Sequence, residues 1–91
     1  MSLNVRIPPQ LRTLTGGAGE VQVEGSTVGE ALKALDAAHP GMGDRLFDED
    51  GHLRRFVNVF LADEDVRFLE GLATPVADGE TLSIVPAVAG G

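Results

Sequence analysis

Apolar and polar residues alternate in two segments of the first quarter of the chain. Residues 3–7 and residues 20–24 both follow a period of two, which is typical of a strand with one buried face. A glycine-rich turn at 15–19 lies between them. We therefore predict a β-hairpin whose long connection holds a short helical turn near 10–14.

A helical pattern follows this hairpin. Thr27 is followed three residues later by Glu30, which is the spacing of an N-terminal capping box. From there, apolar residues recur every three or four positions and form one stripe: Val28, Ala31, Leu32, Leu35 and Ala38. This pattern predicts an amphipathic helix of about three turns that Pro40-Gly41 ends.

The second half of the chain predicts further strands. Residues 41–55 show little periodicity, and we expect only a short helical turn there. Residues 56–61 are mostly β-branched and aromatic, which is typical of a strand. A turn at 63–65 leads to an expected short return strand at 66–68, and residues 81–85 form a last strand that a proline stops.

The predicted order is therefore β-β-α-β-β-β, with one main helix after the first hairpin. One helix can cover only one face of a sheet, and the first and last strands then pair in parallel at its centre. We predict an α+β fold of the β-grasp (ubiquitin-like) type, a mixed four- to five-stranded sheet covered by one main helix. Residues 1–86 form this domain, and residues 87–91 a flexible C-terminal tail that ends in Gly-Gly.

Composition narrows the function of such a domain. The 91 residues contain no Cys, which excludes a disulfide framework, a thiolate metal site and a cysteine nucleophile. The net charge is −7, and a surface of this sign repels nucleic-acid phosphates and anionic lipids. We see neither a targeting segment nor an apolar run of the roughly 20 residues that a membrane helix needs. We expect a cytoplasmic protein that binds neither nucleic acid nor membrane.

The polar residues do not form a known catalytic or metal-binding arrangement. His39 is interpreted as a cap at a helix end, and His52 as a solvated residue of an acidic turn. The run Asp48–Gly51 lacks the ligands that a calcium loop needs before and after it. Residues 63–65 are interpreted first as a turn and alternatively as an acidic patch for a basic partner. We therefore expect no metal site and no independent enzyme activity.

The last five residues are the remaining candidate for function. Ala87, Val88, Ala89, Gly90 and Gly91 carry no charged or bulky side chain. Glycine backbone can approach another protein closely, so this tail fits a narrow channel in a partner enzyme. Its only reactive group is the α-carboxylate of Gly91, which must be activated before acyl transfer, for instance as an acyl-adenylate. A partner has to supply that activation.

Several segments spread over nearly the whole chain carry a family resemblance: Ile7-Pro8, Leu11-Arg12, Thr15–Gly17, Arg55–Val59, Asp63–Phe68, Gly71–Thr74, Ala77–Gly79 and the tail. In these segments the sequence resembles the ubiquitin-like sulfur-carrier proteins of the MoaD/ThiS family. Within that family it is most similar to the CysO-type carriers of actinobacteria.

The resemblance implies a role for the terminal glycine. In that family an E1-like enzyme uses ATP to adenylate the terminal carboxylate, and sulfide then displaces AMP to leave a thiocarboxylate. For CysO-type carriers a PLP-dependent cysteine synthase uses this sulfur, and a metalloprotease releases the product. Carried over to Gly91, supported by Gly90, this implies a sulfur carrier that is not an enzyme and binds no cofactor itself. Cysteine, or a metabolite such as a thiosugar, is the implied product.

Two alternatives use the same tail, and a third does not need it. A ubiquitin-like modifier would form isopeptide bonds through Gly91, and only Lys33 could serve chain-building on the protein itself. A MoaD-type small subunit of molybdopterin synthase is the second alternative. An adaptor-like binding module would tolerate the loss of both terminal glycines.

A partner-binding patch is expected beside the tail. If alternate residues of the 57–61 strand face the helix, Phe56, Asn58 and Phe60 lie on the other face. Either the 41–55 segment covers these three side chains, or they form an exposed patch for the activating enzyme. Nearby arginines are interpreted as solvated charges: Arg54, Arg55 and Arg67.

Overall fold

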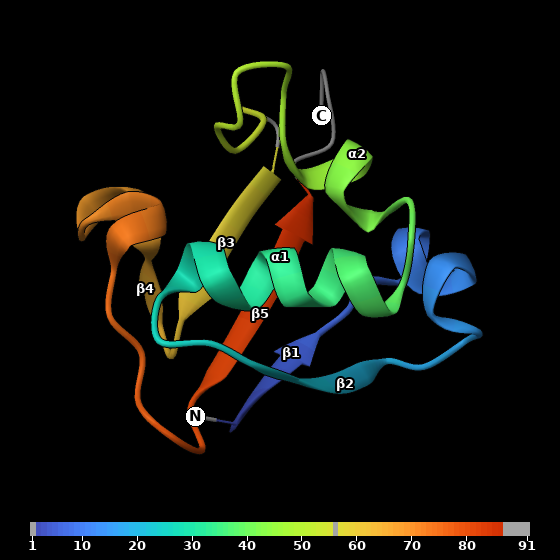
Figure 1. The fold of residues 1–91 in the computed structure, drawn as a ribbon, viewed down its shortest axis with the longest axis horizontal. Helices are drawn as coiled ribbons and strands as arrows, with labels where there is room; N and C mark the ends of the chain where they lie inside the picture. Colours follow the sequence, from blue (N-terminus) through green and yellow to red (C-terminus); the bar gives the residue numbers. More distant parts are fainter. Residues whose placement is uncertain (1, 56, 87–91) are drawn as a thin grey trace.

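The computed structural model describes residues 2–55 and 57–86 (Figure 1). A five-stranded sheet has the spatial order β2-β1-β5-β3-β4. Its strands are β1 (Ser2–Arg6), β2 (Glu20–Glu24), β3 (Val57–Leu61), β4 (Glu64–Asp65) and β5 (Thr81–Pro86). The helices are α1 (Val28–Ala38), α2 (Met42–Leu46) and the short 3₁₀ helices η1 (Pro9–Thr15), η2 (Val66–Phe68) and η3 (Gly71–Ala73).

The first and last strands lie side by side at the centre of the sheet. β1 and β5 run parallel, with Val5 opposite Leu82, while β2 and β3 pair antiparallel on their outer sides. Helix α1 crosses one face of the sheet (Figure 1). The predicted α+β, β-grasp architecture is therefore confirmed, including the parallel pairing that a single covering helix requires.

The core lies between α1 and the sheet. Four residues of the predicted helical stripe are buried: Val28, Ala31, Leu32 and Leu35. The fifth, Ala38, is exposed at the helix end. The sheet supplies the facing side chains, among them Leu3, Val5 and Leu82, and α2 closes one end with Met42 and Leu46.

The start of α1 forms by local hydrogen bonding, as the capping spacing predicts. The Thr27 hydroxyl accepts from the Glu30 amide at 3.2 Å. The Glu30 carboxylate accepts from the amide of Ser26 at 2.9 Å, one residue before the position of a standard capping box. Ahead of it, a Cβ on Gly25 would lie 2.7 Å from the Ala31 backbone nitrogen, so the chain passes α1 too closely for a side chain there.

The prediction of a return strand at 66–68 is wrong. The strand that returns beside β3 is β4, and Val66–Phe68 forms the 3₁₀ helix η2. The Asp65 carboxylate accepts from the Arg67 amide at 2.9 Å and so favours a helical turn. Val66 is fully buried, so its β-branched side chain fills the core instead of extending a strand.

In the part of the chain that the structure describes, the longest helix has 11 residues, and none of the helices could span a membrane.

Candidate functional site at the end of the sheet

The candidate site begins where β5 ends. Pro86 pairs with Val57, and Val85 pairs with Asn58, while β1 flanks the other side of the strand. The tip of β5 points toward the end of the molecule where α2 lies (Figure 1). The residues on which the function was predicted to depend, Gly91 and the segment Ala87–Gly90, follow directly and lie outside the described residues.

The two faces of β3 divide as the alternation predicts. Val57 and Val59 are buried against the core, and Leu61 packs against the same cluster. Asn58 and Phe60 are partly exposed on the other face, and Phe56 lies outside the described residues. Val85 is opposite Asn58 and is 44% exposed. An apolar surface with a polar amide therefore continues from β3 onto the strand that carries the tail.

Arg67 forms hydrogen bonds with the beginning of β3 and with a residue shortly before it. Its guanidinium donates to the Asn58 side-chain oxygen at 2.8 Å and to the carbonyls of Arg54 and Val57 at 2.7 and 2.8 Å. β4 pairs with Phe60 and Leu61, so the arginine serves the part of the strand edge that β4 does not reach. Side-chain cover of this kind protects an edge strand.

Arg67 is exposed, as the interpretation of a solvated charge expects, but its guanidinium also makes these hydrogen bonds, which the sequence did not predict. Its acceptors lie 9 to 13 residues away in sequence, and no local pattern relates them to the arginine. Arg54 also makes a contact, through a hydrogen bond of 3.0 Å from its Nε to the Asp44 carbonyl. Of the two, Arg67 holds the backbone of the residue that pairs with Pro86.

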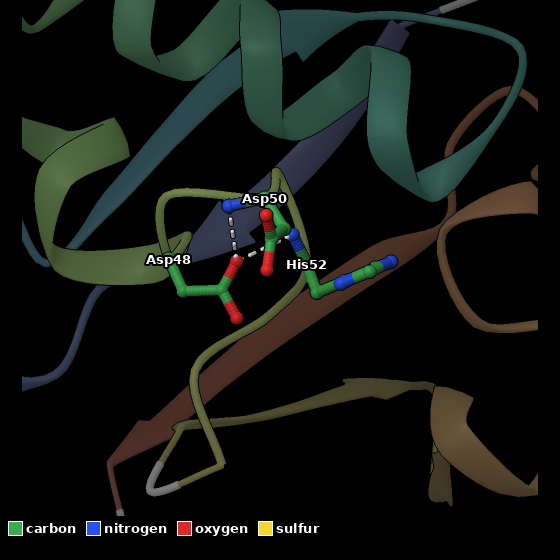
Figure 2. Close-up of side chains that lie close together, drawn as sticks. All are labelled: Asp48, Asp50 and His52. Carbon is green, nitrogen blue, oxygen red and sulfur yellow. Dashed lines mark hydrogen bonds between the residues drawn. The ribbon is translucent and has the colours of Figure 1, made fainter.

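An exposed turn brings Asp48, Asp50 and His52 together (Figure 2). One potential ligand atom from each lies within 4.8 Å of the others. The Asp48 carboxylate accepts from the amides of Asp50 and His52 at 2.9 and 3.0 Å. The His52 amide is the first cause that lowers the pKa of Asp48, and the Asp50 amide and the nearby positive charges of His52 and Arg54 act in the same direction. We interpret these bonds as closing the turn.

His39 lies where the sequence placed it, at the end of α1. It is the C-cap residue, and its backbone N–H donates to the Leu35 carbonyl at 2.8 Å. On the exposed side of the same helix, Lys33 lines a cleft of about 480 Å³ with Phe47 and Leu72. Lys33 is the only lysine of the chain, and this position makes its amine accessible.

The chain is similar to known proteins over its full length. A family model described as the ThiS family matches residues 5–91. The "Sulfur carrier protein CysO" of Mycobacterium tuberculosis is 48% identical over 93 residues, which cover 100% of both chains. The "Small archaeal modifier protein 3" of Haloferax volcanii is 42% identical over 66 residues, which cover 72% of this chain and 71% of that one.

Solved structures show the same similarity. A chain of the Amycolatopsis orientalis BexX/CysO complex has a TM-score of 0.92 and 49% identity, covering 98% of this chain and 99% of that one. The Mycobacterium tuberculosis CysO structure has a TM-score of 0.90 and 46% identity, covering 94% and 99%.

Proposed function

The chain belongs to the ThiS family, and from this premise we propose that it is a sulfur carrier whose working group is the Gly91 carboxylate. One observation carries the proposal. It is the similarity, over the full length of the chain, to a protein named as a sulfur carrier. The family match, which includes Gly91, agrees with it. The fold supports the proposal, because β5 places Pro86 at the end of a central strand, immediately before the tail.

The chemistry proposed for the tail is activation followed by sulfur transfer. A carboxylate oxygen of Gly91 attacks the α-phosphorus of ATP in an E1-like partner, and pyrophosphate leaves. Sulfide then attacks the carbonyl carbon of the acyl-adenylate, and AMP leaves with the electron pair of the broken C–O bond. The product is a thiocarboxylate, which is anionic at neutral pH and acts as a nucleophile without a general base.

The contribution of this chain is presentation of the tail. The partner's pocket supplies proximity and any cofactor, and the tail needs only to be thin enough to enter. The sulfur is held on a terminal carbonyl, so the absence of Cys from the sequence does not conflict with sulfur transport. We therefore propose that ATP and PLP belong to the partners and that this chain is their protein substrate.

The proposed partners act in sequence. An E1-like enzyme activates the tail, and a synthase then accepts the sulfur. A PLP-dependent cysteine synthase is our first assignment, with release of the product by a metalloprotease, and a thiosugar synthase is the second. The solved BexX/CysO complex supports protein–protein binding by a similar chain. The cytoplasmic location stays a prediction from the sequence.

The open face of the sheet is our candidate for the surface that the activating enzyme contacts. Asn58, Phe60 and Val85 lie on it next to the last pairs of β5, and Phe56 completes the patch predicted from the sequence. Apolar side chains at this place are suited to an enzyme that must also receive the tail.

A second function is favoured by one specific finding. The chain is 42% identical to a protein named as a small archaeal modifier, and a modifier would join Gly91 to a lysine of another protein. The two functions differ in their product. A sulfur carrier leaves a thiocarboxylate or a sulfur-containing small molecule, whereas a modifier leaves a covalent adduct on a target lysine.

Pyrophosphate exchange with an E1-like enzyme and ATP tests the proposal. We expect the intact chain to support exchange and a chain lacking Gly90 and Gly91 to support none. A chain with Gly91 amidated is the matched control, because it keeps the tail and lacks the acid. Exchange that is unaffected by these changes would exclude Gly91 as the activated group.

A further inference from the structure

Phe68 projects from the molecule at the turn that follows β4. Its side chain is 87% exposed, and the adjacent Leu69 is 40% exposed. A phenylalanine side chain that stays in water lacks the roughly 1.5–3 kcal/mol of stabilisation that full burial would give. Single exposed apolar residues need no explanation by themselves, so the surroundings of Phe68 decide whether it has a role.

The backbone that carries Phe68 is firmly held. Val66 is fully buried two residues before it, the Leu69 amide donates to the Val66 carbonyl at 3.0 Å, and Asp65 caps the turn. After it, the buried Thr74 hydroxyl accepts from the Glu70 amide at 3.0 Å and donates to the Gly71 carbonyl at 2.7 Å. Phe68 is thus an aromatic side chain presented by an ordered turn, and little entropy is lost when such a group binds.

The charged residues near Phe68 in sequence are mostly acidic. Four carboxylates lie within five positions of it in sequence: Asp63, Glu64, Asp65 and Glu70. The neighbouring Arg67 is the one basic residue in this range, and its guanidinium donates to Asn58 and to two backbone carbonyls. The turn therefore presents an apolar knob, Phe68, in a segment of negative net charge, and the complementary surface is an apolar socket bordered by Arg or Lys.

The turn that carries Phe68 is linked to the end of β5 through Arg67. Arg67, which precedes Phe68, donates to the Val57 carbonyl, and Val57 pairs with Pro86. The turn that carries Phe68 is therefore linked through Arg67 to the strand that pairs with the end of β5.

We propose that Phe68, supported by Leu69, is an anchor by which the activating enzyme recognises this chain, through a basic-rimmed apolar socket. This inference rests on the proposed function and adds a contact beyond the sheet face. The activating enzyme is the occupant because it receives an ordinary carboxylate, which any protein C-terminus carries. It must select the chain by its folded surface, whereas a sulfur acceptor can also recognise the thiocarboxylate.

The anchor is tested by adenylation kinetics with Phe68→Ala. We expect KM for the carrier to rise about 30-fold, the loss typical of an interface hot spot, with kcat unchanged because the residue acts in binding. The thermal midpoint should stay the same, because the side chain is exposed. Phe68→Leu is the matched control and should recover most of the affinity.

The contribution of the acidic residues near Phe68 is tested by the salt dependence of binding to the activating enzyme. Asp63→Asn combined with Glu64→Gln should weaken binding and flatten its dependence on salt. Glu20→Gln combined with Glu24→Gln removes the same charge from β2, at the opposite edge of the sheet, and should leave that dependence closer to the wild-type value.

Each outcome decides a separate point. An unchanged KM for Phe68→Ala, or a loss confined to kcat, overturns the anchor while the proposed function stands. A loss seen only with a sulfur-accepting enzyme shows that the assigned occupant is wrong. If the wild-type chain is not adenylated at all, the proposed function fails, and this inference fails with it.

Discussion

Gly25 is a residue whose importance is visible only in the folded chain. A Cβ at this position would lie 2.7 Å from the Ala31 backbone nitrogen and 3.0 Å from the Glu30 carbonyl carbon. Because backbone atoms cannot move aside cheaply, we expect Gly25→Ala to lower the free energy of unfolding by about 1–3 kcal/mol. Urea unfolding measures this change.

Gly19→Ala is the control for Gly25. Its Cβ would meet only the Arg12 guanidinium, at 3.2 Å, a side-chain group that can shift although it donates to the Ile7 carbonyl. The new residue also has less freedom in the unfolded chain. We expect Gly19→Ala to change the free energy of unfolding by close to zero. An equal loss of stability in both variants would contradict the close approach described at Gly25.

Asp48 gives the stability of the 48–52 turn a dependence on pH. The pKa of its carboxyl is below its ordinary value of 3.8 because of the hydrogen bond from the His52 amide and the other groups that favour the charged form. Its contribution is therefore present above the unfolded pKa and is lost as the pH falls through the lower folded pKa. We expect Asp48→Asn, which keeps an acceptor oxygen, to lower the thermal midpoint at pH 7.

Asp48→Asn also tests the sign of this pH dependence. Below pH 3.8 the two midpoints should converge as the wild-type carboxyl takes up its proton. A difference that persists or grows on acidification would contradict this role for the Asp48 charge.

At the scale of elements, Arg67 shows how a turn stabilises a strand edge. Its guanidinium donates to Val57 and Asn58 of β3 and to Arg54, which precedes the strand. Arg67→Lys keeps the charge but cannot match this fork of donors, and we expect it to lower the free energy of unfolding by about 1 kcal/mol or more. Amide exchange should accelerate in β3 at 57–59 and stay slow in β1. Unchanged protection of β3 would show that the strand does not depend on Arg67.

The face of the sheet that carries Phe60 can be tested separately. Phe60 is only partly buried, so Phe60→Asp should leave the fold intact and weaken binding to the activating enzyme in calorimetry. Gln22→Asp, on β2 across the sheet, introduces the same carboxylate and should have a smaller effect. Unchanged affinity for Phe60→Asp would remove the patch from consideration.

Local patterns predicted the elements that depend on nearby residues. The cap of α1 needs only Thr27, Glu30 and their neighbours, so the sequence reveals it. η2 could not be found this way, because Val66 and Phe68 have strand propensity and the Asp65 cap outweighs it. The contacts of Arg67 were missed because they depend on how β3 and η2 pack together.

At the scale of the whole molecule, the fold was predictable because one helix and its flanking strands have few arrangements with a single covered face. The candidate site at Gly91 stays a prediction, because that residue lies outside the described part of the chain. The role of Phe68 was not predictable, because exposure on an ordered turn is a property of the folded protein. Among the described residues, the core extends from Leu3 to Ile84.

The most direct test of the account is the intact mass of the chain after incubation with an E1-like enzyme, ATP and a sulfide source. We expect a mass gain equal to the difference between one sulfur and one oxygen atom, located at Gly91 by fragmentation. A chain lacking Gly91 should unfold at the same temperature and gain no mass. If the intact chain is adenylated and still acquires no sulfur, or acquires it elsewhere, the chain is not the carrier proposed here.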